Sequence, residues 1–252
     1  MHARPGSLLL ALLLPLVGSA ASPVAEVNVN VDLTKEGRKI PRPTPAQPTY
    51  YAPLAGGFHE EGDLMAGTTP PPQDFVLSQL SKALAAQGYL PASAQTPAPT
   101  VLLVFHWGSL NPDIMRTPFG TMLLNEKKMT ALVAGNTVEN LNPFSERQDA
   151  LRAEYQDRYF VMVSAYDYAA ATQRKKIPLW RAKMSMPSHH VSLVDAVPVL
   201  IASGAPLLGR DTLRPVWVTK PLERQGTVNL GELNVEEYAQ PTAKPTEEST
   251  RR

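Results

Sequence analysis

The stretch TVLLVFHW, residues 100–107, decides the fold. It is a continuous run of strand-forming, mostly apolar residues, with Pro99 before it and Gly108 after it. A short apolar run bounded by proline and glycine is typical of a strand inside a sheet. The run therefore predicts a buried central strand.

The segment before this strand predicts a helix over 73–87. In PPQDFVLSQLSKALAAQGY, the residues Val76, Leu77, Leu80 and Leu84 fall at helical spacing. Prolines precede the helix and Gly88 follows it, which is the usual order of proline and glycine at helix ends.

The segments after the central strand predict further helices and strands. Residues 159–168 and 177–186 are expected to form two strands joined by the polar QRKK. A helix is expected from Met122 to a stop at Gly135, and a second within NPFSERQDALRAEYQDR (142–158), where Ser145 and Gln148 form a capping box. A third is expected from an Asp195 N-cap to Ser203. Further strands are expected in RPVWVTKPL (214–222) and TVNLGELNVEEY (227–238). The fold class predicted is α/β (α+β), a two-layer sandwich of a mixed β-sheet covered by helices.

The two ends of the chain differ from its middle. Residues 1–21 have a short positive start, an apolar run and small residues at Ala20 and Ala21, which predicts a signal peptide cleaved there; an uncleaved anchor is the alternative. Residues 22–48 alternate Val with Asn and then become proline-rich, as in an extended strand or arm followed by a linker. A single domain is expected over 49–238, and a disordered tail over 239–252.

Composition narrows the range of functions. The chain has 252 residues, a net charge of +1 and no cysteine. Acids and bases are mixed along it, so no basic stripe marks a nucleic-acid binder. The lack of cysteine removes disulfides and thiolate chemistry. No serine-hydrolase elbow, HExxH zinc motif or phosphate-binding loop occurs, and no cofactor is expected.

Two sets of polar residues are candidates for a site. Asp167 and Arg181, on the two strands of the expected hairpin, are a candidate polar pair. His189, His190, Asp195 and His59 are candidate metal ligands, with His106 as an alternative partner. Adjacent histidines point to opposite sides of an extended chain. We therefore expect His189 and His190 to lie in a polar loop. His59 is expected to lie in a mobile acidic loop, GGFHEEGD (56–63).

Five short segments carry a resemblance to a known group of proteins. They are TYYAPL (49–54), AAQGYLPA (85–92), PTVLLVFHWG (99–108), VSAYDY (163–168) and IPLWRAKMS (177–185). Over residues 49–210 this pattern resembles uncharacterised exported bacterial cell-envelope proteins, domains of unknown function related to small envelope lipoproteins. The resemblance implies that Asp167 and the Trp180–Arg181 pair lie on neighbouring hairpin strands. The lipid-bearing cysteine of such lipoproteins is absent here.

These observations favour a non-catalytic exported envelope protein, located in the periplasm or otherwise exported. It would bind or assemble with an envelope protein or glycan partner, without stable membrane insertion after signal cleavage. The alternative is a metal-dependent hydrolase that uses the clustered His and Asp residues.

Overall fold

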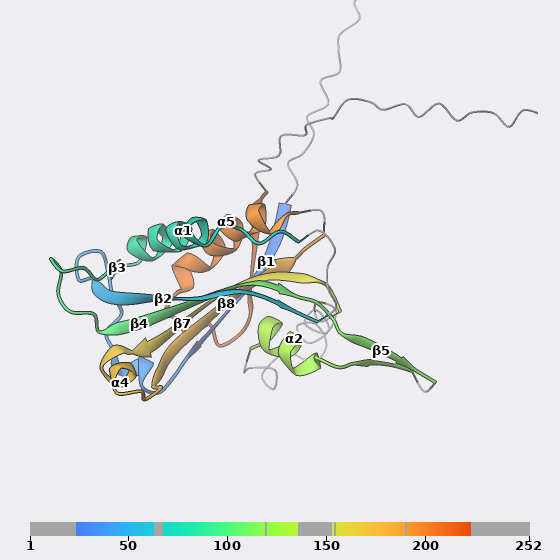
Figure 1. Ribbon diagram of the computed structural model, residues 1–252, viewed down its shortest axis with the longest axis horizontal. Coiled ribbons are helices and arrows are strands. Elements are labelled where there is room, and N and C mark those ends of the chain that lie inside the picture. Colours follow the sequence, from blue (N-terminus) through green and yellow to red (C-terminus); the bar gives the residue numbers. More distant parts are fainter. Residues whose placement is uncertain are drawn as a thin grey trace, which may run out of the picture.

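A mixed sheet of seven strands runs through the protein, in the order β3-β2-β4-β7-β8-β1-β9 (Figure 1). The computed structural model describes residues 24–62, 68–118, 120–135, 153, 155–189 and 191–222. The strands are β1 (Val24–Leu33), β2 (Thr49–Glu61), β3 (Tyr89–Pro91), β4 (Val101–Leu110), β7 (Arg158–Asp167), β8 (Pro178–Pro187) and β9 (Val216–Pro221), with a separate hairpin of β5 (Ile114–Thr117) and β6 (Gly120–Leu123). The helices are α1 (Gln73–Ala86), α2 (Glu126–Val133), α4 (Tyr168–Thr172) and α5 (Leu193–Gly204), with 3-10 turns η1 (Gly37–Lys39) and η3 (Ala205–Leu207).

The expected central strand, the helix before it and the hairpin after it are confirmed as β4, α1 and β7–β8. Strand β4 pairs in parallel with β2 and antiparallel with β7. The β2–β4 pair is parallel because α1 lies between the two strands in sequence and crosses over between them. The sheet is therefore mixed, and the α+β class is correct.

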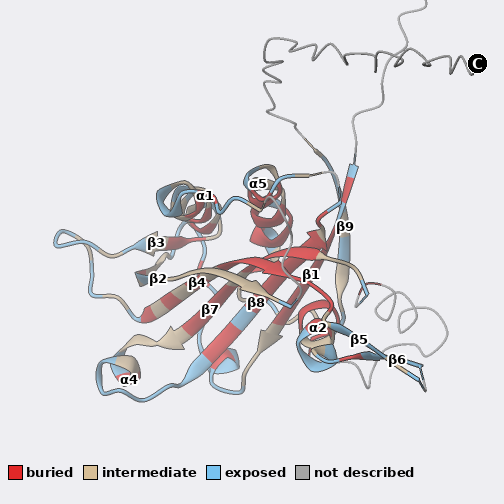
Figure 2. Ribbon diagram, turned by 45° about the vertical axis from the view of Figure 1, so that its right-hand side comes forward, coloured by how far each residue is buried: buried red, intermediate tan, exposed pale blue. Residues whose placement is uncertain are grey.

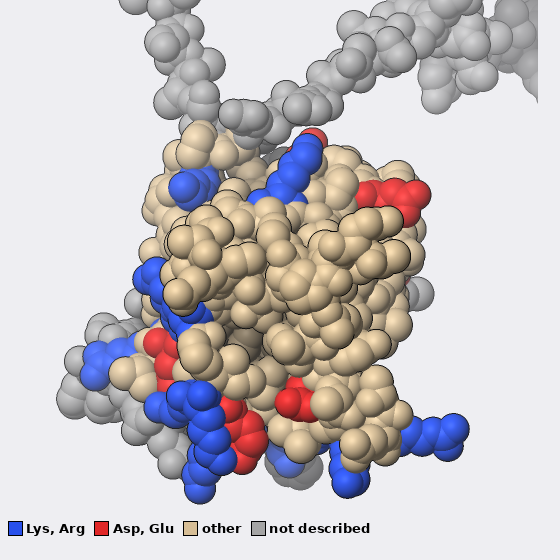
Figure 3. Space-filling model, turned by 90° about the vertical axis from the view of Figure 1, so that its left-hand side faces the viewer, with Lys and Arg blue, Asp and Glu red and all other residues tan. Residues whose placement is uncertain are grey.

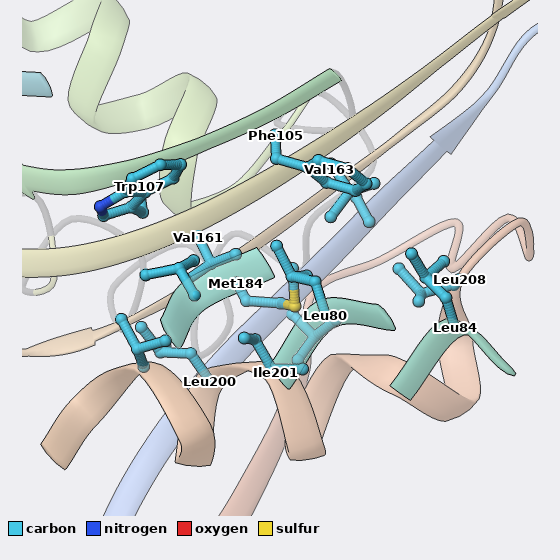
Figure 4. Packing of buried hydrophobic residues seen from close by; sticks show 14 of the residues in the cluster. Leu80, Leu84, Phe105, Trp107, Val161, Val163, Met184, Leu200, Ile201 and Leu208 are labelled. Atoms are coloured by element: carbon cyan, nitrogen blue, oxygen red, sulfur yellow. The ribbon is translucent and has the colours of Figure 1, made fainter. Parts of the chain in front are cut away.

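The main core lies between one face of the sheet and helices α1 and α5 (Figure 4). Alternate residues of each strand point to this face because side chains alternate along a strand. The sheet contributes Phe105, Trp107, Val161, Val163 and Met184, and the helices contribute Leu80, Leu84, Leu200 and Ile201, all in one buried cluster. Full burial of one such side chain contributes about 1.5–3 kcal/mol.

Helix α2 lies on the opposite face of the sheet, near the β5–β6 hairpin (Figure 2). It contributes Met129 and Leu132 to a second, smaller cluster with Leu110 and Phe160. Among the helices of the described residues, none is drawn over the middle of that face in Figures 1 and 2. This uncovered part carries the polar residues discussed below.

The N-terminal segment with alternating Val and Asn is strand β1, and it lies inside the sheet. It pairs antiparallel with β8 on one side and with β9 on the other. Val27, Val29 and Val31 are buried in the main core. The fold therefore begins before Thr49, because the valines complete the apolar face.

Strand β2 contradicts the expectation of a loop over 56–63. Its residues up to Glu61 pair with β4, with a register shift between Ala55 and Gly57. On the side away from β4, β2 pairs with β3 only as far as Tyr51 in the described residues. Pro53, which lacks an N–H group, therefore breaks no strand-to-strand hydrogen bond on that side. The glycine pair marks a β-bulge rather than the start of a loop.

Two helix starts also differ from expectation. Met122 belongs to strand β6, and helix α2 begins only at Glu126. The N-cap of α5 is Ser192, whose side chain accepts a hydrogen bond from the amide of Asp195, so Asp195 lies inside the first turn. The signal peptide, the segment 227–238 and the tail lie outside the described residues, as does most of the segment 142–158, of which 153 and 155–158 are described. Within the described ranges, no helix has the length and apolar character needed to cross a membrane.

Candidate functional site

A groove of about 510 Å³ lies on the face of the sheet that carries α2. Its apolar wall includes Leu110, Leu132, Phe160 and Met162. Its charged and hydroxyl-bearing residues are Asp32, Thr34, Glu61, Lys128, Ser164, Tyr166, Arg181 and Lys183. Concave, largely apolar sites with a few polar groups are the usual form of ligand pockets.

The polar lining follows from strand register. Met162 lies opposite Lys183, and Ser164 lies opposite Arg181, in the antiparallel β7–β8 pair. Directly opposed residues point to the same face of a sheet. The residues next in sequence to the core residues Val161, Val163, Ala182 and Met184 therefore point to the groove side, because side chains alternate along a strand.

Lys183 connects helix α2 to the sheet. Its Nζ donates to Oδ2 of Asp32 at 3.0 Å and to the carbonyl oxygen of Ala131 in α2 at 2.8 Å. The Lys183 side chain is only 8% exposed. A buried ammonium needs both a counter-charge and hydrogen bonds to offset the loss of hydration, and this one has them.

Arg181 is exposed at the other end of the groove. Its Nε donates to Oγ of Ser164 at 3.0 Å, and its Nη2 makes a longer contact of 3.5 Å with the hydroxyl of Tyr166. Asp32 lies opposite Arg181 in register, yet its carboxylate pairs with Lys183. Arg181 is therefore bonded to hydroxyl groups, whereas Lys183 is bonded to the Asp32 carboxylate.

A pair of imidazoles lies at the edge of the same face. Nδ1 of His106 is 3.0 Å from Nε2 of His59, which is also 3.1 Å from the carbonyl oxygen of Gly56. Nε2 of His59 satisfies both neighbours only as a donor, because a carbonyl oxygen can only accept. Nδ1 of His106 is then the unprotonated acceptor.

The surroundings of His106 favour the neutral form of its ring. Burial lowers the pKa of His106 below its ordinary value, and the positive charges of His59 and Arg181 lower it further. Both causes disfavour the imidazolium, one by desolvation and the other by repulsion. This agrees with the acceptor role of Nδ1 in the pair.

A second buried cation, Arg158, lies where β7 begins. It is 0% exposed, and its Nε donates to Oγ of Ser185 at 3.2 Å. Nη1 and Nη2 meet no hydrogen-bond partner among the described residues. Burial lowers the pKa of Arg158 to about 10.

The candidate pair Asp167 and Arg181 is not brought together. Asp167 lies opposite Val101, a core residue, whereas Arg181 lies opposite Ser164 on the groove face. The Asp167 carboxylate accepts a hydrogen bond from the amide of Ala170 at 2.7 Å and caps α4. Residues on opposite faces of a sheet cannot pair, so Asp167 is a cap and Arg181 belongs to the groove.

The candidate metal ligands are also separated. His189 is exposed in a turn after β8, and His190 lies outside the described residues. Asp195 accepts a hydrogen bond from Ser192 in α5, on the sheet face away from His59. In the part of the chain that the structure describes, no three His, Asp or Glu side chains are placed to hold a metal ion. His59 is in contact with the ring of His106 and with the carbonyl oxygen of Gly56.

Sequence reasoning missed Asp32, Ser164 and Lys183 as members of the groove. The alternation of polar and apolar residues in WRAKMS could have indicated these residues, because it places Arg181, Lys183 and Ser185 on one face of β8. What the sequence did not give was the register that sets Asp32 and Ser164 beside them.

Comparison with known proteins gives no family. No family model matches the chain, and no curated protein matches it. Among solved structures, it is similar to a PDZ domain protein from Parabacteroides distasonis ATCC 8503, with 10% identity and a TM-score of 0.40, over 79% of this chain and 39% of that one. It is also similar to the PelC dodecamer from Paraburkholderia phytofirmans, with 13% identity and a TM-score of 0.35, over 73% of this chain and 99% of that one. Similarity at this level assigns neither a family nor an activity.

Proposed function

We propose that this chain is a non-catalytic exported bacterial envelope protein that binds a ligand in the groove between α2 and the sheet. The observation that carries the proposal is the make-up of that groove. It has an apolar wall, and its charged groups are held in fixed structural contacts such as Lys183 with Asp32 and Lys128 with Glu61. Groups held in this way favour retention of a ligand over proton transfer, which needs a group with a tuned pKa at the reacting atoms.

The layer arrangement is part of the proposal. In it, α1 and α5 form the second layer over one face of the sheet, and α2 covers only part of the other face (Figure 1). A sheet face left partly open next to a helix gives a ligand access to side chains of several strands at once.

Export rests on the sequence. The leader over 1–21, the absence of cysteine and the resemblance to envelope proteins all favour a periplasmic or otherwise exported location. The charge distribution agrees with a partner other than nucleic acid. On the face seen in Figure 3, Lys and Arg lie around the rim together with Asp and Glu, and the middle is uncharged.

A neutral fluorescent probe tests the groove. N-phenyl-1-naphthylamine is expected to bind the purified full chain with increased fluorescence, and Met162→Glu, which places a charge on the apolar wall, is expected to weaken binding at least tenfold. Val194→Glu is the control, because Val194 is exposed in a separate groove beside α5. Urea unfolding of each variant confirms that it is folded. Equal binding by wild type and Met162→Glu, or no binding by wild type, would refute the groove as a ligand site.

Export is tested separately. Residues 1–40 fused to alkaline phosphatase lacking its own leader are expected to give active enzyme outside the cytoplasm. A fusion with Leu12→Arg and Leu13→Arg is expected to be inactive. An inactive wild-type fusion would contradict export.

A further inference from the structure

The polar end of the groove presents several hydrogen-bond donors, and within the described ranges the charge of Arg181 is paired with no carboxylate. Ser164 and Tyr166 accept hydrogen bonds from Arg181, so the single proton of each hydroxyl is left to donate elsewhere. Neither hydroxyl donates to any other residue in the described ranges. Ser164, Tyr166 and Arg181 are thus neighbouring donors in the lining of the groove.

The charge at this place is available to a ligand. The groove is lined by three cations and two carboxylates. Both carboxylates are engaged, Asp32 with Lys183 at 3.0 Å and Glu61 with Lys128 at 2.6 Å. Arg181 is left as the cation whose bonds go to neutral hydroxyls, and a guanidinium favours two-pronged binding of a carboxylate.

The other end of the groove is hydrocarbon. Phe160, Leu110 and Leu132 belong to the apolar cluster under α2, and Met162 lies between that cluster and Ser164 on β7. From Ser164 to Phe160 is four residues of strand, roughly 13 Å. This length suits an extended chain of medium length rather than a compact ring.

The backbone around the groove favours an acyl chain over a peptide. Strands β7 and β8 are each paired on both sides, so neither offers a free edge to a peptide backbone. The carbonyl oxygen of Ala131 in α2 is already taken by Lys183. A peptide lying along Phe160 and Met162 would bury amide groups without partners, which is costly, whereas a methylene chain has none to satisfy.

We propose that the groove binds a medium-chain fatty acid, with the carboxylate on Arg181, Ser164 and Tyr166 and the acyl chain along Met162 towards Phe160. This rests on the proposed function, since it names the ligand class of the same groove. The carboxylate replaces water at an exposed cation, and the chain buries hydrocarbon against hydrocarbon, at about 0.8 kcal/mol for each methylene group removed from water.

The test is displacement of N-phenyl-1-naphthylamine by decanoate from the full chain. Decanoate is expected to displace the probe, and Arg181→Gln is expected to weaken the binding of decanoate at least tenfold more than it weakens the binding of the probe. Decanol, which has the same chain without the charge, is expected to bind equally to wild type and Arg181→Gln. Butyrate, which has the charge without the chain, is expected not to displace the probe.

The outcomes separate this inference from the proposed function. If the probe binds in a Met162-dependent way but decanoate does not displace it, the fatty-acid assignment is wrong and the groove remains a binding site. Equal decanoate affinity for wild type and Arg181→Gln also refutes the assignment. So does displacement by an apolar peptide with a free C-terminal carboxylate under conditions where decanoate fails.

Discussion

The ring of His106 lies against the backbone of Gly56, and a β-carbon added at residue 56 would overlap that ring. The bulge in β2 thus leaves space for the imidazole of His106 on β4. The same contact positions His106 beside His59, at 3.0 Å between Nδ1 and Nε2. A glycine in a strand often marks the close approach of another group, and here that group is an imidazole.

The first prediction concerns this contact. Gly56→Ala is expected to lower the free energy of unfolding by about 1–3 kcal/mol, because the added methyl group must displace the His106 ring. Urea unfolding measures the change. In a His106→Ala background, the same substitution should lower the free energy of unfolding by less than about 0.5 kcal/mol. An unchanged cost in that background would show that the His106 ring is not the obstacle.

The second prediction concerns pH. The pKa of His106 is lowered in the folded state, so the unfolded chain binds this proton at a higher pH than the folded chain does. The contribution of neutral His106 to stability is therefore complete above about pH 6.5 and is lost as the pH falls through the lowered pKa. Wild type is expected to lose more stability than His106→Asn between about pH 7.5 and pH 5, measured by urea midpoints.

The control for the pH prediction is His189→Asn. His189 is exposed in a turn. This variant should keep the wild-type pH dependence. If His106→Asn and His189→Asn behave alike, the titration belongs to another group.

The third prediction concerns the connection between α2 and the sheet. Lys183→Met should lower the free energy of unfolding by about 3 kcal/mol, because it leaves the Asp32 carboxylate without its buried partner. Amide exchange in α2 should also become faster, since the bond to Ala131 is lost. Lys128→Met is the matched control: its pair with Glu61 is exposed and should cost less than about 1 kcal/mol. If Lys183→Met and Lys128→Met lowered the free energy of unfolding equally, burial would not be what makes the Lys183–Asp32 pair more important than the Lys128–Glu61 pair.

The fourth prediction concerns Arg158. Arg158→Met is expected to raise the free energy of unfolding by about 1 kcal/mol or more, because a buried guanidinium with two nitrogen atoms lacking partners in the described structure is replaced by an apolar chain of similar length. Ser185→Ala, which removes the acceptor of Nε, should destabilise wild type and have little effect beside Arg158→Met. A large loss of stability in Arg158→Met would show that the cation is compensated by a group not described here.

The elements with strong periodicity could be predicted from the sequence. Helix α1 and strands β4, β7 and β8 occur where the spacing of apolar residues placed them, because a helix and a strand bury residues at different periods. Strand β2 could not be predicted. Pro53, Gly56 and Gly57 are typical of loops. They are accommodated in a strand because β4 pairs with one side of it, and no described strand pairs with the other side beyond Tyr51.

The candidate site was predicted only in part. The hairpin positions of Asp167 and Arg181 were expected, but parity along β7 turns Asp167 to the core side and Ser164 to the groove. His59 and His106 are 47 positions apart, and only the parallel β2–β4 register brings their rings together. Local sequence does not encode the register between distant strands.

The sequence by itself determined which residues of each strand could be buried, since the alternation of apolar and polar side chains depends on the chain alone. The tertiary structure decided which polar residues meet. The strand order β4-β7-β8-β1 places Arg181 and Lys183 between Ser164 and Asp32, and the Asp32 carboxylate pairs with Lys183. The physical reason is that strand pairing fixes neighbours across the sheet, and charges separated by many residues interact only after that pairing has formed.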